Sequence, residues 1–265
     1  MMNRVLSYLK FLLQSTNRHG VHSPFIYDLV TKCFNDKTKY PEYQKLEQYR
    51  KSLLENNTVI SVTDFGAGSK VFKSNNRKTS AIAKNAGISK KRAALIFRIT
   101  RYLQPENILE IGTSLGLATS ALSLGNINAK ITTLEGCPNT QNVAKNLFQS
   151  QGFDFNTPNF ITTEFSSYLL NRKTNSGIKQ ENYSLIYFDG NHSKKATLEY
   201  FELLLPTISN KTVWIFDDIH WSKDMEAAWK IIKNHPKTTV TIDTFQWGIV
   251  FFRKEQAKEH FVIRV

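Results

Sequence analysis

The sequence has little cysteine and no long apolar run. Its two cysteines, Cys33 and Cys137, have the spacing of neither a metal site nor a redox pair. The longest apolar runs, such as residues 213–216 and 249–252, are too short to span a bilayer. The apolar N-terminal pattern is interrupted by Lys10, and no small-residue cleavage site follows it. We therefore expect a cytoplasmic protein without a membrane span.

Acidic residues are absent between Phe65 and Pro105, in a 265-residue chain whose net charge is +13. This stretch holds ten basic residues, namely Lys70, Lys73, Arg77, Lys78, Lys84, Lys90, Lys91, Arg92, Arg98 and Arg101. Two interpretations stay open. The stretch attracts an anionic substrate or surface, or it is a solvated face without a partner.

The periodicity divides the chain near residue 105. Residues 1–104 are predicted to form a helical, basic N-terminal cap, and residues 105–265 an α/β domain. The cap has predicted helices at 5–13, 25–34, 42–54 and from Ser89 to Pro105, with a short strand at 59–63. In the second part, strands at 107–111, 131–135, 159–162, 184–188 and 213–216 alternate with helices, which predicts a mostly parallel sheet. The last two strands, 239–242 and 247–252, are too close for a crossover, so the final strand is predicted to be antiparallel.

Two glycine-bearing turns compete as the nucleotide loop. The turn from Glu110 to Gly116 lies between a predicted strand and a helix, and Glu135 ends the next strand, where a ribose-binding acid is needed. The turn from Asp64 to Ser69 has no such acid or strand after it. We interpret it as a loop of the cap, or as a segment that closes over the active site. Ser114 replaces the middle glycine of the dinucleotide fingerprint, which disfavours an NAD-dependent oxidoreductase.

Four motifs in order resemble those of class I S-adenosylmethionine (SAM)-dependent methyltransferases. They are Glu110-Ile-Gly-Thr-Ser, Thr133-Leu-Glu-Gly, Tyr187-Phe-Asp-Gly-Asn-His and Phe216-Asp-Asp. The whole set is similar to the metal-dependent O-methyltransferase branch, with its catechol and macrolide-sugar enzymes. The resemblance implies a Rossmann-like, mostly parallel seven-stranded sheet with an antiparallel last strand, plus a helical N-terminal extension. It further implies that SAM is the cofactor and that Glu135 binds its ribose. The residues implied at the methionine end are Glu110, Gly112, Thr113, Ser114 and Gly116.

The chemical groups are expected at the ends of two later strands. Asp189, Asp217 and Asp218 would repel one another unless they share a cation, and Mg²⁺ prefers such oxygen ligands. Alternatively, Asp217 or Asp218 caps the next helix, although Ser222 is better placed to do so. His192 follows Asp189 and is the first candidate for the base that deprotonates the acceptor, or else it is a loop or capping residue.

Two further features bear on partners. His220 is the second candidate base, and it could wall an acceptor pocket together with Trp221. The segment from Arg18 to Phe25 contains two histidines, and we favour a capped turn over an anion site.

The loop from Asp189 to His192 lacks the Asn/Asp-Pro-Pro-aromatic sequence of enzymes that methylate base amines. A small hydroxylated acceptor is therefore expected, and it is anionic if the basic stretch between Phe65 and Pro105 serves to attract it. The alternative is an RNA-binding or anionic-surface-binding protein on the same fold. A homodimer is compatible with the sequence.

Overall fold

The computed structural model describes residues 2–65, 72–153, 158–174 and 182–265. The chain forms two compact units. Unit 1 contains Met1–Asn35 and Ser166–Val265, and unit 2 contains Asp36–Phe165. This division follows the packing of the chain, and the domain boundary expected near residue 105 stays a prediction. No helix in the described part of the chain is long and apolar enough to cross a membrane.

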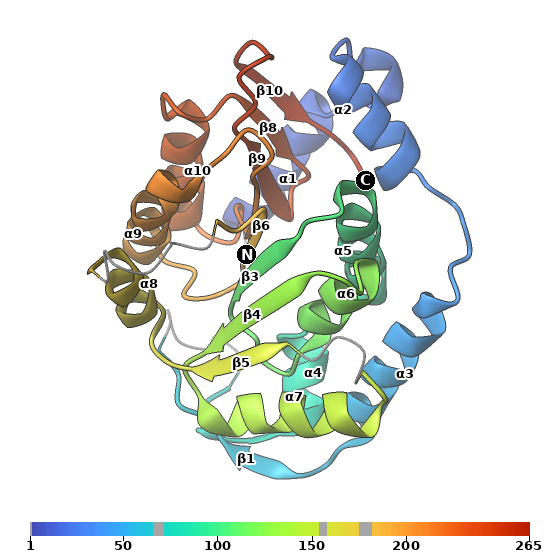
Figure 1. Ribbon diagram of the computed structural model, residues 1–265, viewed down its shortest axis with the longest axis vertical. Coiled ribbons are helices and arrows are strands. Elements are labelled where there is room, and N and C mark those ends of the chain that lie inside the picture. The colour runs from blue at the N-terminus through green and yellow to red at the C-terminus, as the bar shows by residue number, and fades with distance from the viewer. Residues whose placement is uncertain (1, 66–71, 154–157, 175–181) are drawn as a thin grey trace. The chain divides into compact units, whose positions relative to one another are not determined.

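Unit 2 is built on three parallel strands in the order β3-β4-β5 (Figure 1). They are β3 (Asn107–Ile111), β4 (Lys130–Glu135) and β5 (Asn159–Thr162). Its helices are α3 (Glu42–Glu55), α4 (Thr79–Asn85), α5 (Lys90–Leu103), α6 (Leu117–Gly125) and α7 (Pro138–Ser150). The register places Glu110 beside Thr133 on the neighbouring strand. The strands therefore place the first two of the four motifs, at Glu110 and at Thr133, side by side.

Helix α5 illustrates how capping residues in the local sequence determine where a helix begins and ends. Ser89 accepts a hydrogen bond from the Arg92 N–H at its start, and Gln104 ends it in a left-handed conformation. The helix packs closely along α6, where a Cβ atom added to Gly125 would lie 2.5 Å from the Cβ of Thr100. A glycine at this place lets the two helix backbones approach each other.

A two-stranded ribbon interrupts the helices of the first hundred residues. Strand β1 (Val59–Ser61) confirms the short strand predicted there, and it pairs antiparallel with β2 (Asn76–Lys78), which was not predicted. The ribbon contacts the start of α7, where the Asn139 side chain donates to the Ser61 carbonyl at 2.7 Å. The ribbon is thereby fixed next to the end of β4.

The described residues of unit 1 form five strands in the order β10-β8-β9-β7-β6. They are β6 (Leu185–Phe188), β7 (Val213–Asp217), β8 (Val240–Asp243), β9 (Trp247–Phe251) and β10 (Glu259–Val262). Strand β9 is antiparallel to both β7 and β8, whereas β6 is parallel to β7, and β10 to β8. The α/β class with a mostly parallel sheet and an antiparallel last predicted strand is thus confirmed. Strand β10 adds one strand to the seven that were predicted.

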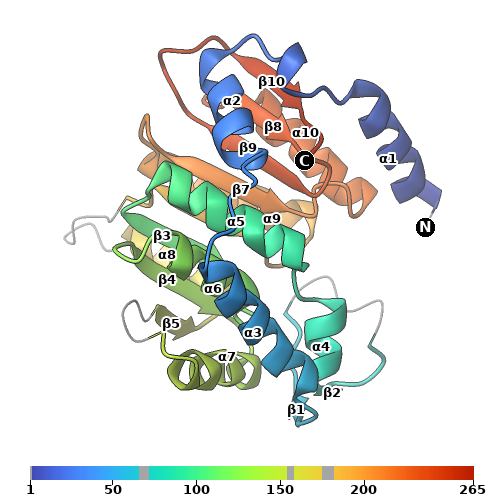
Figure 2. The same cartoon turned by 90° about the vertical axis from the view of Figure 1, so that its right-hand side faces the viewer.

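Helices cover both faces of the unit 1 strands (Figure 2). Phe25 of α2 packs edge-on against Phe251 of β9 at 5.0 Å between ring centroids. On the other face, a Cβ atom at Gly248 would lie 2.5 Å from the ring of Trp229 in α10. The helical segments are α1 (Met2–Gln14), η1 (Arg18–Gly20), α2 (Pro24–Leu29), η2 (Val30–Phe34), α8 (Phe165–Thr174), α9 (Lys194–Leu204), η4 (Leu205–Thr207) and α10 (Lys223–Asn234).

The segment after α1 meets the C-terminal strand within unit 1. Thr16 forms a parallel bridge with Ile263, and its N–H donates to the Val262 carbonyl at 2.8 Å. The Arg264 N–H donates back to the Thr16 carbonyl at 3.3 Å. The segment after α1 is therefore tied to the end of β10.

Candidate functional site

The turn after β3 is folded against β4. The N–H groups of Gly112 and Thr113 both donate to the Leu134 carbonyl, at 2.9 and 3.0 Å. Three of its residues have positive φ, at 107° for Gly112, 48° for Ser114 and 80° for Gly116. Glycine is therefore suited to the two outer positions. Because two N–H groups of the turn are engaged by β4, the turn is held rigidly at the strand ends.

Gly116 serves close packing inside unit 2. An added Cβ atom would lie 2.5 Å from the Tyr49 hydroxyl oxygen and 3.2 Å from both Ala144 and Phe148. Tyr49 is fully buried and donates to the Leu115 carbonyl at 2.9 Å. Burial, together with the charge of Glu110, raises the pKa of Tyr49. No local pattern marked Tyr49 as part of the site, because its position on α3 is typical of the apolar face of a helix.

Glu110 is a fully buried carboxylate, and hydrogen bonds from two hydroxyl groups compensate for its loss of contact with water. Its Oε2 accepts hydrogen bonds of 2.6 Å from Thr119 and from Thr133. Thr113 lies 2.6 Å from the Thr133 hydroxyl, whose single proton is directed at Glu110, so Thr113 is the donor. Glu110 and Thr113 are thereby linked through Thr133. Burying a charge without such partners would be costly.

Glu135 is held by backbone N–H groups of two turns. Ser114 donates to Oε2 at 2.7 Å, and Cys137 donates to Oε1 at 2.9 Å. Burial raises the pKa of Glu135 despite these N–H groups, and the charge of Asp64 raises it further. The structure thus brings together Ser114 and Glu135, two residues that the sequence placed in one cofactor site.

The start of the competing turn lies beside Glu135. Asp64 forms an ion pair with Arg77 at 3.6 Å, and Phe65 packs against Gly136. Gly66 to Ser69, the rest of this turn, lies outside the described residues. Other basic residues of the stretch between Phe65 and Pro105 also have partners: Lys90 pairs with Glu47, Arg98 donates to the Tyr43 hydroxyl, and Arg101 lies over the Tyr40 ring.

In unit 1, the predicted carboxylates follow two neighbouring parallel strands. Asp189 comes directly after β6, and Asp217 ends β7. The Asp218 N–H donates to the Asp217 side chain at 2.8 Å, with Asp218 in a left-handed conformation. His192 Nε2 lies 3.5 Å from Asp189 Oδ1. Burial lowers the pKa of His192, but the hydrogen bond and charge of Asp189 and the charges of Asp217 and Asp218 raise it to about 9.

The helix caps next to these residues are serines. Ser193 accepts from the Ala196 N–H at the start of α9, and Ser222 accepts from the Met225 N–H at the start of α10. The capping alternatives for His192, Asp217 and Asp218 therefore lose their support. Among the residues that the structure describes, no three His, Cys, Asp or Glu side chains form a group arranged to hold a metal ion.

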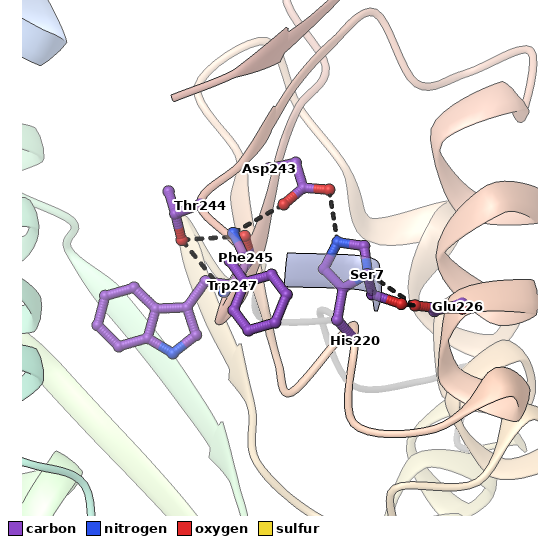
Figure 3. A network of polar contacts seen from close by, with 7 residues as sticks. All are labelled: Ser7, His220, Glu226, Asp243, Thr244, Phe245 and Trp247. Carbon is purple, nitrogen blue, oxygen red and sulfur yellow. Dashed lines mark hydrogen bonds and ion pairs between the residues drawn. The ribbon is translucent and has the colours of Figure 1, made fainter. Parts of the chain in front are cut away.

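His220 lies between two carboxylates (Figure 3). Its Nε2 is 2.8 Å from Asp243, and its Nδ1 is 3.1 Å from Glu226, which also accepts a hydrogen bond from Ser7 of α1. Burial lowers the pKa of His220, yet the two carboxylates raise it overall. Because both ring nitrogens are engaged, His220 is less suited than His192 to act as a base. Asp243 ends β8 just as Asp217 ends β7, a signal that the sequence interpretation missed.

The other two features from the sequence have structural partners. The Arg4 guanidinium lies 5.1 Å from the centroid of the Trp221 ring. Ser23 caps α2 and accepts a hydrogen bond from Gln256 at 2.6 Å, which agrees with the capped turn expected between Arg18 and Phe25.

Comparisons with known proteins agree with this architecture. Residues 109–219 match a family described as a methyltransferase domain. No curated protein matches the sequence.

Three solved structures have similar folds. A methyltransferase from Podospora anserina bound to S-adenosylhomocysteine (SAH) has a TM-score of 0.58 and 14% identity, over 88% of this chain and 97% of that one. An O-methyltransferase from Bacillus cereus in complex with SAH has a TM-score of 0.55 and 16% identity, over 85% of this chain and 96% of that one. An O-methyltransferase of tomaymycin synthesis from Streptomyces achromogenes, in complex with SAM, has a TM-score of 0.55 and 12% identity, over 82% and 91%. Residues 109–219 are therefore similar to a methyltransferase domain, and the chain has the α/β fold of these methyltransferases, as the sequence predicted.

Proposed function

We propose that the protein transfers a methyl group from SAM to a hydroxyl group of a small acceptor, with an anionic acceptor favoured by the net charge of +13. The observation that carries the proposal is Glu135, held at the end of β4 by the Ser114 N–H at 2.7 Å. This contact joins Glu135, the last residue of β4, to the glycine-bearing turn that follows β3. The similarity to O-methyltransferases in complex with SAH or SAM supports the same choice.

Unit 2 would bind the cofactor. The Glu135 oxygens accept backbone N–H groups from Ser114 and Cys137, and the Gly136 N–H also acts on this carboxylate. A carboxylate offers about four lone-pair sites, which leaves acceptors for the ribose hydroxyls of SAM. Glu110 has no exposed surface, so it would not touch the cofactor. Its negative charge would instead attract the cationic methionine end of SAM through the electric field in the site. A pyrophosphate would be repelled by this charge, which is why SAM fits the turn better than a dinucleotide.

Unit 1 would supply the acid–base chemistry. A general base must be neutral before it accepts a proton, and the pKa of His192 is about 9. At neutral pH His192 is therefore mostly protonated, and the fraction able to act as base grows as the pH approaches 9. Asp189 orients the imidazole through its contact with Nε2. Methyl transfer itself needs the acceptor oxygen aligned with the sulfonium carbon, so positioning is the main contribution to rate.

A Mg²⁺ ion would assist the reaction in this proposal. Asp189, Asp217 and Asp218 offer the hard oxygen ligands that Mg²⁺ takes, and their charges act together on His192. Within the described part of the chain, these side chains do not form a group arranged for a metal ion, so no step is assigned to the metal. Turnover measured with Mg²⁺ and with a chelator decides whether the cation is required.

Calorimetry with SAM and with NAD, each with and without Mg²⁺, tests the cofactor. We expect SAM to bind and NAD not to bind, and lack of SAM binding near millimolar concentration would refute the proposal. A panel of hydroxylated and anionic small molecules, with RNA as a comparison, then tests the acceptor by mass spectrometry of the product. Methylation of RNA with no small-molecule product would contradict the acceptor class. Full turnover by His192→Ala across pH 6–9 would remove His192 as the base.

A further inference from the structure

The end of the β1–β2 ribbon is attached to the turn that carries Glu135. The Thr63 N–H contacts the Cys137 sulfur at 3.4 Å, and Asn139 donates to the Ser61 carbonyl at 2.7 Å. These contacts join the start of α7, directly after the turn that follows β4, to the chain leading into Asp64 and Phe65. Contacts from Ser61 and from Thr63 therefore hold this segment close to Glu135.

Asp64 fixes the direction in which the segment leaves the ribbon. Its carboxylate pairs with Arg77 of β2 at 3.6 Å, and the Arg77 guanidinium also lies 4.9 Å from the centroid of the Phe72 ring. The Arg77 side chain is 11% exposed and the Asp64 side chain 31%, so the arginine is shielded from water while the carboxylate is partly solvated. Asp64 lies close enough to Glu135 for its charge to raise the pKa of that carboxyl.

Phe65 fills the place where Gly136 has no side chain. A Cβ atom on Gly136 would lie 2.6 Å from Cδ2 and 3.1 Å from Cε2 of the Phe65 ring. Gly136 directly follows Glu135, the acid proposed to bind the ribose. Yet the Phe65 side chain is 50% exposed although it is packed against this backbone. An aromatic ring is thus held beside the predicted ribose acid with a large part of its surface in water.

We propose that Phe65 contacts the adenosine part of SAM and sets the affinity of the site for the nucleoside. This inference rests on the proposed function, because it takes Glu135 as the ribose-binding acid. A purine base next to the ribose presents a flat aromatic face, and burial of the exposed Phe65 surface against it is favourable. Asp64 and Arg77 are positioning residues that keep the ring beside Gly136. A residue from the N-terminal part of the chain thereby completes the cofactor site of unit 2.

The test is calorimetric binding of SAM and of 5′-methylthioadenosine, which carries the same nucleoside without the amino-acid end, to the full-length chain. Stacking of a base on an aromatic side chain is typically lost as roughly a five- to hundredfold weaker Kd when the ring is removed. We expect Phe65→Ala to weaken both ligands by a similar factor in that range. Phe65→Tyr should bind like the wild type, whereas Phe65→Leu, which fills the space without a ring, should bind weakly.

Val59→Ala is the matched control, because Val59 is 56% exposed on the same ribbon. It should leave both affinities unchanged. Equal SAM affinity of wild type and Phe65→Ala would overturn the role of Phe65 while leaving the SAM site intact. A loss for SAM without a loss for 5′-methylthioadenosine would equally reject a nucleoside contact. If the wild type itself binds no SAM, the proposed function fails first, so the two failures are distinguishable. Thermal unfolding of each variant shows whether it is folded. If Phe65→Ala is unfolded, the SAM affinity of Phe65→Leu is compared with that of the wild type in its place.

Discussion

Replacing Gly116 by alanine should destabilise unit 2 through backbone strain and through steric overlap. The φ of Gly116 is 80°, and a left-handed conformation costs an ordinary residue about 1–2 kcal/mol. The new Cβ atom would also lie 2.5 Å from the Tyr49 hydroxyl and 3.2 Å from Ala144 and Phe148. Overpacking in a dense core costs about 1–3 kcal/mol, so the sum is about 2–5 kcal/mol. Denaturant unfolding measures this change.

Gly152→Ala provides the matched control. Gly152 also has a left-handed backbone, with φ of 67°, but an added Cβ atom would meet nothing within 4 Å. Its substitution should therefore cost only the backbone part, about 1–2 kcal/mol. Tyr49→Phe removes the nearest atom, so Gly116→Ala should cost less in that background than in the wild type. Equal costs for Gly116→Ala and Gly152→Ala, with no coupling to Tyr49, would refute the packing argument.

Three further variants test other parts of the structure. The folded-state pKa of His192 is raised from 6.5 to about 9, so its stabilising contribution is complete below pH 6.5 and is lost as the pH rises through about 9. Its size is at most about 3 kcal/mol. Urea unfolding from pH 6 to 9 should show this loss, and His192→Gln should flatten it; an unchanged slope would contradict the shift. Glu110→Ala leaves the Thr119 and Thr133 hydroxyls without their common acceptor and should cost about 2–4 kcal/mol of unfolding free energy, whereas Ser150→Ala on the surface should cost little. Gly248→Ala would bring a Cβ atom to 2.5–2.7 Å from the Trp229 ring and should lower the melting temperature, with a change in tryptophan fluorescence; an unchanged melting temperature would show that the ring moves freely.

Strand positions in the methyltransferase domain followed well from local sequence. The predicted strands 107–111 and 159–162 coincide with β3 and β5, and the short gap before Trp247 led to the antiparallel β9. Buried strands in such sheets are continuous apolar runs bounded by turn residues, and that pattern is local. The helix caps at Ser89 and Ser222 were recognised for the same reason. Each of these predictions depends on residues that are neighbours in the chain.

The features that were missed depend on distant residues. Strand β10 has only a short alternating pattern, and its pairing with β8 comes from packing. The burial of Tyr49 against Gly116 joins α3 to the turn after β3, and no local pattern encodes it. The contact of Phe65 with Gly136 likewise joins segments far apart in sequence. The sequence analysis selected Glu110, Ser114 and Glu135 because they lie in or directly after the last residues of a strand, and their role in a cofactor site stays a prediction.

The bridge between Thr16 and Ile263 has a consequence for the order of folding. Unit 2 is a continuous segment, whereas unit 1 is assembled from both ends of the chain. During synthesis, the residues of unit 2 are complete before β6 to β10 exist, and α1 must wait for strands that emerge after unit 2. Contacts between residues far apart in sequence form slowly because the intervening loop must close first. We therefore expect unit 2 to fold before unit 1 closes, with Phe11 of α1, which is buried in the folded chain, needing protection from aggregation until then.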